Sequence, residues 1–178
     1  MKLHQNETLF REAIIVAAQR LNIKEIFIEK DYWVTLVLYT LFKSELSNFI
    51  VFKGGTALSK CFGFIQRFSE DIDLVVLQDG DESGNALKKK LKAISNQISE
   101  IMPEVEVEGI THKMGVIRKT AHSFQKTFEG DYGQVRREII VESGWLGSFE
   151  PYSTNIISSY LHHMITETGQ VHLISEFD

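Results

Sequence analysis

Apolar residues in the first quarter of the chain recur at helical spacing and predict two helices. Over residues 8–21 they return every three or four positions, and Asn22 supplies a stop signal. Over residues 24–43 they are frequent enough to form a wide apolar face, made of Ile26, Phe27, Trp33, Val34, Val37, Leu38, Leu41 and Phe42. We therefore expect the second helix to be substantially buried.

The period changes after residue 48, where short apolar runs predict strands. Residues 49–52 stop at a glycine pair, and residues 71–77 form a second run. Between the two runs, residues 57–62 predict a short helix that Thr56 caps. Residues 85–102 carry their apolar side chains on one face and predict an amphipathic helix.

Strand patterns dominate the second half of the chain. The predicted elements there are strands over 105–108, 115–126 and 134–143, a helix over 156–166 and a final strand over 171–177. Helices followed by a mixed set of strands and helices indicate an α+β fold, with a mixed sheet flanked by helices. We expect an N-terminal helical pair, residues 1–45, packed on a core formed by residues 46–178.

The composition is typical of a folded protein of a reducing compartment. Of the 178 residues, 43% are hydrophobic and 24% are charged, and the net charge of −5 gives no global signal for nucleic acid. The single cysteine, Cys61, excludes a disulfide within the chain. No apolar stretch reaches the ~18 residues that span a bilayer, and the first residues lack the pattern of a signal peptide. We expect a cytoplasmic protein with no membrane partner.

Two aspartates on a predicted strand are the first candidates for chemistry. Asp71 and Asp73 are two positions apart, so strand alternation places both on one face, while Ile72 points into the core. Neighbouring carboxylates repel each other unless a cation lies between them. Mg²⁺ is the expected cation, because it prefers oxygen ligands and binds through one or two carboxylates together with substrate phosphates.

A glycine turn upstream of these aspartates predicts a phosphate site. Gly54, Gly55 and Thr56 lie between a predicted strand and a predicted helix. Glycines allow the backbone to approach a ligand closely, and a helix N-terminus offers N–H groups to phosphate. The Thr56 hydroxyl is a further candidate donor to a terminal phosphate oxygen. A phosphate site followed by a carboxylate pair indicates metal-assisted phosphoryl transfer.

Several other residues complete the candidate site, and each also has an ordinary structural explanation. Glu142 ends an apolar run and is our choice for a third metal-binding carboxylate, with Glu138 as the alternative. The candidates for nucleotide binding outside the Gly-Gly-Thr turn are Lys53, Lys60, Arg67 and Ser69. The lysines flank the glycine turn but are equally typical of a solvated surface. Arg67 either clamps phosphate or pairs with a neighbouring glutamate, and Ser69 either contacts the nucleotide or shapes a turn.

These segments resemble the signature of the AbiEii/AbiGii toxin family of nucleotidyltransferases. The two main segments are residues 53–60, Lys-Gly-Gly-Thr-Ala-Leu-Ser-Lys, and residues 67–74, Arg-Phe-Ser-Glu-Asp-Ile-Asp-Leu. Residues 29–34, Glu-Lys-Asp-Tyr-Trp-Val, are similar to a helix typical of that family. Residues 140–144, Ile-Val-Glu-Ser-Gly, resemble its strand with the third carboxylate. The resemblance extends over residues 25–150.

The resemblance implies a fold, a substrate and a biological role. It implies a DNA-polymerase-β-like nucleotidyltransferase core, an NTP substrate, and Mg²⁺ as two ions, with Mn²⁺ as the alternative. It also implies the toxin of a toxin–antitoxin or phage abortive-infection system, with an antitoxin partner. By position, Gly55 and Thr56 would contact phosphate and Asp71 and Asp73 would bind metal, while Glu142 would activate or orient the attacking hydroxyl.

Members of that family continue into a helical C-terminal region with a basic motif, whereas this sequence ends at Asp178. We therefore expect a fragment or a reduced homologue. Three functions stay open: a nucleotidyltransferase, a catalytically incomplete nucleotide-binding or interaction module, and a metal-dependent phosphohydrolase. The carboxylate pair favours the transferase over the module, and the glycine turn favours it over the phosphohydrolase.

The acceptor of the nucleotidyl group is expected to be an RNA, such as tRNA, or a protein. Residues 113–137 form a locally basic segment, with Lys113, Arg118, Lys119, Lys126, Arg136 and Arg137. If these strands lie beside the one that ends at Glu142, their cations would guide an RNA backbone toward the metal site. An ordinary solvated sheet face accounts for the same pattern equally well.

Overall fold

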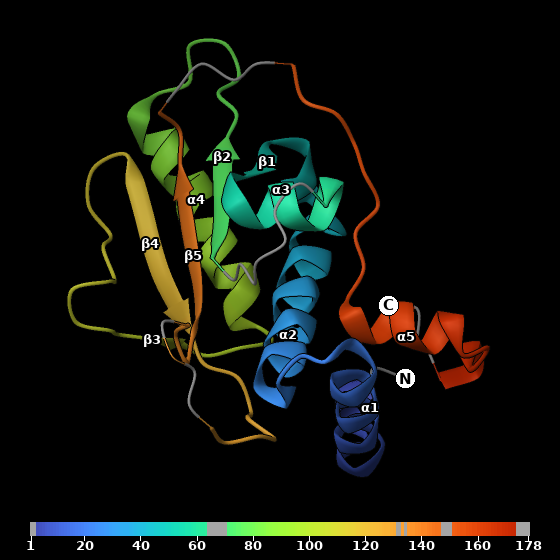
Figure 1. Ribbon diagram of the computed structural model, residues 1–178. Helices are drawn as coiled ribbons and strands as arrows, with labels where there is room; N and C mark the ends of the chain where they lie inside the picture. The colour runs from blue at the N-terminus through green and yellow to red at the C-terminus, as the bar shows by residue number, and fades with distance from the viewer. Residues whose placement is uncertain (1–2, 64–70, 131–132, 134, 147–150, 174–178) are drawn as a thin grey trace.

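A computed structural model of the chain describes residues 3–63, 71–130, 133, 135–146 and 151–173 (Figure 1). Its α-helices are α1 (Glu7–Leu21), α2 (Glu25–Phe42), α3 (Gly54–Phe62), α4 (Gly84–Ser99) and α5 (Tyr160–Glu167). Its strands are β1 (Ile50–Lys53), β2 (Ile72–Val76), β3 (Glu104–Val105), β4 (Ile117–His122) and β5 (Ile139–Gly144). Short 3₁₀ turns form η1 (Leu3–Gln5), η2 (Glu45–Asn48) and η3 (Val171–Leu173). The predicted α+β class with an N-terminal helical pair is confirmed.

The five strands form one mixed sheet in the order β1-β2-β5-β4-β3. Strands β2 and β5 are parallel, and the other neighbouring strands are antiparallel. The register places Asp73 opposite Glu142 on the parallel pair and opposite Lys53 on the antiparallel pair. Lys119 of β4 lies in turn opposite Glu142. One row of charged side chains therefore crosses four strands.

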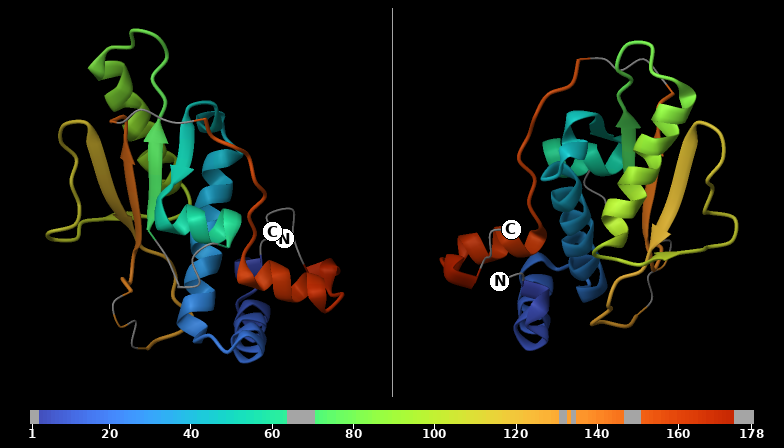
Figure 2. Two further views of the ribbon diagram at one scale, coloured as in Figure 1. Left: turned by 45° about the horizontal axis from the view of Figure 1, so that its top comes forward. Right: turned by 180° about the vertical axis from the view of Figure 1, so that it is seen from behind.

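The two faces of this sheet have different roles. Helices α2 and α4 pack on one face, where Ile72, Leu74 and Val141 are buried (Figure 2). This confirms that Ile72 points into the core. Asp73, between Ile72 and Leu74, and Glu142, next to Val141, point to the other face, as strand alternation requires. Both are only partly buried. The apolar face thus packs the sheet against the helices, and the carboxylates lie on the opposite face.

Helix α2 is buried along most of its length, as its apolar pattern predicts, but three consecutive charged residues are buried with it. Glu29 and Lys30 are 0% exposed and Asp31 is 6% exposed. Buried charges are tolerated in proteins when they are paired and hydrogen-bonded. Successive helical residues point about 100° apart, since a turn holds about 3.6 residues. This buried triplet (Glu29, Lys30, Asp31) can therefore contact three different segments.

Glu29 and Lys30 hold the segment that leads into β5. The Glu29 carboxylate accepts hydrogen bonds from the backbone N–H groups of Thr127, at 2.6 Å, and Phe128, at 3.2 Å. Burial raises the pKa of Glu29, and these two donors oppose that rise. The Lys30 ammonium donates to the backbone carbonyl of Arg136. Two of the three buried charges thus fix one segment of the chain at both ends.

Asp31 joins two other segments. Its Oδ1 lies 2.6 Å from Nζ of Lys60 in α3, and its Oδ2 accepts a hydrogen bond from the backbone N–H of Tyr160 at the start of α5. Lys60 also donates to the Thr35 hydroxyl, at 2.9 Å, and to the Ser158 carbonyl. Side chains of the Asp31–Lys60 pair are 7% and 9% exposed. This pair therefore anchors α3 and α5 to α2.

Some predicted boundaries are wrong. The final strand predicted over 171–177 is instead a 3₁₀ turn over 171–173, and residues 174–177 lie outside the described residues. The strand predicted over 134–143 begins at Ile139, because that residue lies opposite His122, the last residue of the neighbouring strand β4. The strands predicted over 105–108 and 115–126 are shorter than expected. Among the described helices, none has the length and apolar character needed to cross a bilayer.

The Asp31–Lys60 pair provides a first test of this packing. Asp31→Ala leaves a buried ammonium without its carboxylate and is expected to lower the free energy of unfolding by about 3–5 kcal/mol. Urea denaturation measures the loss. Glu167→Ala is the matched control, because it removes a carboxylate from the exposed pair with Arg20. That control should cost less than about 1 kcal/mol, and equal losses in the two variants would contradict the anchoring role.

Candidate active site

The candidate site lies where three predicted carboxylates meet on the open face of the sheet. Asp73 is the second residue of β2, Glu142 lies opposite it on β5, and Asp71 immediately precedes β2. Glu142, not Glu138, is the β5 residue in register with Asp73. Parallel pairing brings these side chains together although they are distant in sequence.

The surroundings of Asp73 disfavour its ionised form. Burial raises the pKa of Asp73, and the negative charges of Glu142 and Asp71 raise it further. The lysines on either side of the row, Lys53 and Lys119, offset this rise in part. A carboxylate in these surroundings favours the binding of a cation.

Two of the three carboxylates are neutralised by cationic side chains. Lys119 Nζ lies 3.1 Å from Glu142 Oε2, and Arg136 Nη1 lies 3.3 Å from Asp71 Oδ2. In the part of the chain that is described, no three His, Cys, Asp or Glu side chains are spaced to hold a metal ion together. The oxygen donors nevertheless have the chemistry that Mg²⁺ prefers. Their metal-binding role stays a prediction.

The glycine turn contacts the site directly. Gly54 starts α3 with a φ of +80°, a conformation that glycine adopts without steric cost. A Cβ at this position would lie 3.0 Å from Cγ and 3.2 Å from Cβ of Asp73, and would overlap its carboxylate oxygen Oδ2. Asp73 can therefore occupy its place only because residue 54 has no side chain. Gly55 follows in the first turn of α3.

Thr56 has a different role from the cap predicted for it. Helix α3 begins at Gly54, and the buried Thr56 hydroxyl donates to the Asp71 backbone carbonyl at 2.5 Å. This bond ties the glycine turn to the start of β2, so the two motifs form one unit. A contact between Thr56 and phosphate stays a prediction.

The remaining nucleotide-binding candidates do not all lie at the turn. Lys53 is exposed beside it, whereas Lys60 is buried against Asp31. The predicted role of Lys60 in neutralising phosphate would require it to leave that pair. Arg67 and Ser69 lie outside the described residues.

The basic segment is more neutralised than its composition indicates. Lys113 and Arg118 both pair with Glu104, and Arg118 also donates to Ser95 of α4. Arg118 thus lies on the helix-covered face, away from the carboxylates. Arg137 is exposed. These pairs favour the ordinary explanation for much of the segment.

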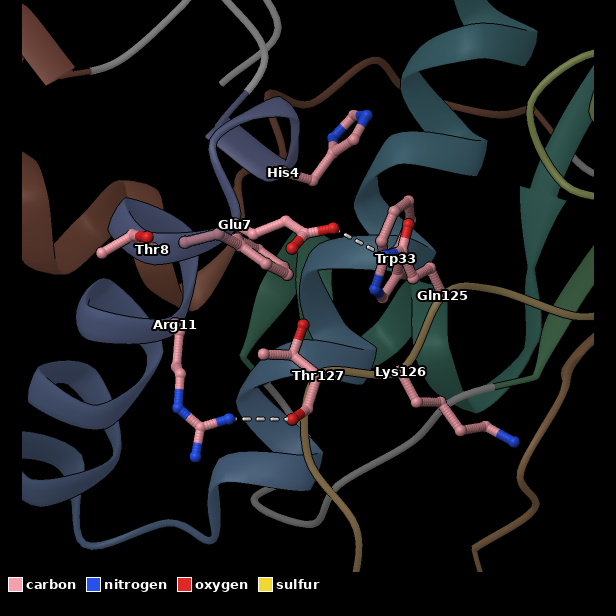
Figure 3. A pocket seen from close by; sticks show the side chains of 9 residues that line it. His4, Glu7, Thr8, Arg11, Trp33, Gln125, Lys126 and Thr127 are labelled. Atoms are coloured by element: carbon pink, nitrogen blue, oxygen red, sulfur yellow. Dashed lines mark hydrogen bonds between the residues drawn. The ribbon is translucent and has the colours of Figure 1, made fainter.

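A separate cavity of about 290 Å³ lies between α1, α2 and the segment after β4 (Figure 3). Its wall includes Arg11, which donates to the Thr127 carbonyl, and Glu7, which accepts a hydrogen bond from Gln125. None of the three candidate carboxylates lines it. The cavity is therefore not the site that the two motifs build.

One family model matches the chain. The family described as nucleotidyl transferase AbiEii toxin, of type IV toxin–antitoxin systems, matches residues 36–175. The chain belongs to this family. No curated protein matches it. The matched range includes the glycine turn, both aspartates and Glu142.

Sequence reasoning noted Lys30, Asp31 and Arg136 but did not predict the contacts by which they shape the candidate site. Lys30 and Asp31 hold the segments that carry Arg136 and Lys60, and Arg136 contacts Asp71. The available signal was the run of three charges inside an otherwise apolar helix. Such a run is costly unless each charge has a partner, and therefore indicates long-range contacts.

Gly54→Ala tests the contact between the turn and Asp73. The variant should lose more stability in urea than Gly63→Ala, because both residues have a positive φ but a Cβ at Gly63 meets nothing within 4 Å. The control carries only the backbone strain, of about 1 kcal/mol. The excess loss in Gly54→Ala measures displacement of Asp73. Equal losses would show that Asp73 does not depend on the bare glycine.

Asp73→Asn tests the electrostatic conflict in metal-free protein. The raised pKa means that ionised Asp73 opposes folding at neutral pH, and that this penalty disappears as the pH falls below the ordinary aspartate value of 3.8. The variant should therefore melt at a higher temperature at pH 7 and show no gain near that acidic limit.

Asp71→Asn serves as the control for that measurement. It removes the ion pair with Arg136 and should not raise the melting temperature. A gain for Asp73→Asn that persists unchanged in acid would show that the penalty does not come from its ionisation.

Proposed function

We propose that this AbiEii-family protein transfers a nucleotidyl group from an NTP to a hydroxyl group of an RNA or a protein. The observation that carries the proposal is the register that sets Asp73 opposite Glu142, together with a glycine turn fitted against Asp73. The family itself supports the general class, a nucleotidyl transferase toxin of a type IV toxin–antitoxin system. We further propose a cytoplasmic location and an antitoxin partner.

Asp71, Asp73 and Glu142 are the residues that would hold Mg²⁺, as two ions, with Mn²⁺ as the alternative. When bound, the metal would neutralise charge on the triphosphate and favour ionisation of the attacking hydroxyl. The fit is supported by the all-oxygen donor set, and by the burial and the carboxylate repulsion that together raise the pKa of Asp73. The exchange of protein cations for metal ions on Asp71 and Glu142 is part of the proposal.

The protein groups then have separate tasks. Backbone N–H groups at the start of α3, at Gly55 and Thr56, would donate to phosphate oxygens. Glu142 would accept the proton of the acceptor hydroxyl while the oxygen of that hydroxyl forms a bond to the α-phosphorus. The bond from that phosphorus to the β-phosphate oxygen breaks, and pyrophosphate leaves. In the metal-free protein, Lys119 holds Glu142 in place through their 3.1 Å contact.

The acceptor is an RNA, such as tRNA, or a protein. An RNA acceptor would be guided by the cations near β5, of which Arg137 is exposed. The pairing of Lys113 and Arg118 with Glu104 leaves fewer cations for this surface than the sequence indicates. The experiment below therefore includes both acceptor classes.

Transfer from each of the four α-labelled NTPs to total RNA and to total protein tests the proposed activity. Asp71→Asn and Asp73→Asn should each reduce label transfer by at least about a hundredfold, because each removes a metal-binding charge. Asp81→Asn makes the same chemical change at an exposed position and should retain wild-type transfer. Near-wild-type transfer in either site variant would contradict the metal-binding assignment.

A further inference from the structure

Arg136 lies at the candidate site although it belongs to neither sequence motif. Its Nη1 lies 3.3 Å from Oδ2 and 3.5 Å from Oδ1 of Asp71, and both side chains are 40% exposed. Residues 135–138 precede β5, the strand of Glu142. The Arg136 guanidinium is thus ion-paired with Asp71, one of the carboxylates that are proposed to bind the metal.

The position of Arg136 is built into the core. The fully buried Lys30 donates to the Arg136 backbone carbonyl, and Glu29 beside it holds Thr127 and Phe128 further upstream. These are charge-assisted hydrogen bonds inside the protein, which are stronger than neutral ones. The guanidinium is therefore presented to Asp71 from an anchored stretch of backbone, unlike a side chain on a free loop.

We propose that Arg136 is a nucleotide-site residue whose guanidinium changes partner, from Asp71 in the nucleotide-free protein to the triphosphate when nucleotide binds. In the nucleotide-free protein it neutralises Asp71. When Asp71 and Asp73 take up a divalent cation, Arg136 turns to the phosphate oxygens that share that cation. The inference rests on the proposed function, because it requires Asp71 to bind metal beside a triphosphate.

Geometry and charge both support the exchange. Arginine binds carboxylate and phosphate with the same planar fork of donors, so one residue can serve both partners. The metal cation and the Arg136 guanidinium compete for binding to the Asp71 carboxylate. On a triphosphate, by contrast, both can bind phosphate oxygens at the same time. Loss of Arg136 should therefore have opposite effects on the two ligands. A purely structural residue would weaken both.

The test compares Arg136→Gln with Arg137→Gln, which makes the same change of net charge at the exposed neighbouring position. Calorimetry measures binding of Mg²⁺ alone, and of inorganic tripolyphosphate at saturating Mg²⁺, so that no base need be chosen. Arg136→Gln should bind Mg²⁺ about two- to fivefold more tightly than Arg137→Gln does, since a competing ion pair of modest strength is lost. It should bind tripolyphosphate at least about tenfold more weakly, since a charge-assisted contact is lost. Arg136→Lys should retain part of the tripolyphosphate affinity.

Other outcomes separate this inference from the proposed function. Equal changes in the two glutamine variants, or weaker binding of both ligands in Arg136→Gln, would overturn the exchange. Unchanged binding of both ligands with weaker RNA binding would overturn it too, and would assign Arg136 to the acceptor. If wild type binds no Mg²⁺, or Asp73→Asn binds it equally well, the proposed function itself is contradicted.

Discussion

The arrangement of the site depends on the pairing of the buried triplet in α2. A charge in the protein interior is unfavourable unless it is hydrogen-bonded, so Glu29, Lys30 and Asp31 each require a fixed partner. Those partners are the segment after β4, the carbonyl of Arg136, and Lys60 with the start of α5. A single buried helix thereby sets the positions of three segments that are far apart in sequence. Apolar packing alone would tolerate a shift of these segments more readily, because it is not directional.

The Asp31–Lys60 pair and Asp73 at the candidate site differ in how completely their charges are matched. The Asp31–Lys60 pair is short, buried and supported by further hydrogen bonds. At the site, burial and then the repulsion from Glu142 and Asp71 raise the pKa of Asp73. Unfavourable electrostatics at one place must be supported by stability elsewhere, and they cluster where a ligand supplies the missing charge. Burial raises the pKa of Glu29 as well, but backbone N–H groups bond its carboxylate, whereas Asp73 faces two other carboxylates. That repulsion is a physical reason, independent of the motifs, to place the chemistry at Asp73.

Local patterns in the sequence predicted most elements but not their long-range contacts. The helices α1, α2 and α4 and the burial of Ile72 follow from periodicity, which depends on neighbouring residues alone. The motifs likewise predicted that Gly54 and Asp73 belong together. The partner of Lys60 is Asp31, in another helix, and nothing near Lys60 in the sequence indicates that it is buried. The start of β5 was missed because it depends on where the neighbouring strand β4 ends, which local pattern does not indicate.

Strand direction explains why separate segments meet at one end of the sheet. Because β2 and β5 are parallel, the residues that precede them, Asp71 and Arg136, lie at the same end. Because β1 is antiparallel to β2, its last residue, Lys53, also arrives there and leads directly into Gly54. The glycine turn, the Asp71 carboxylate and the Arg136 guanidinium thus converge at one end of the sheet. Reversing either strand would carry one of the three to the opposite end, so the mixed pairing of the sheet is itself a requirement of the site.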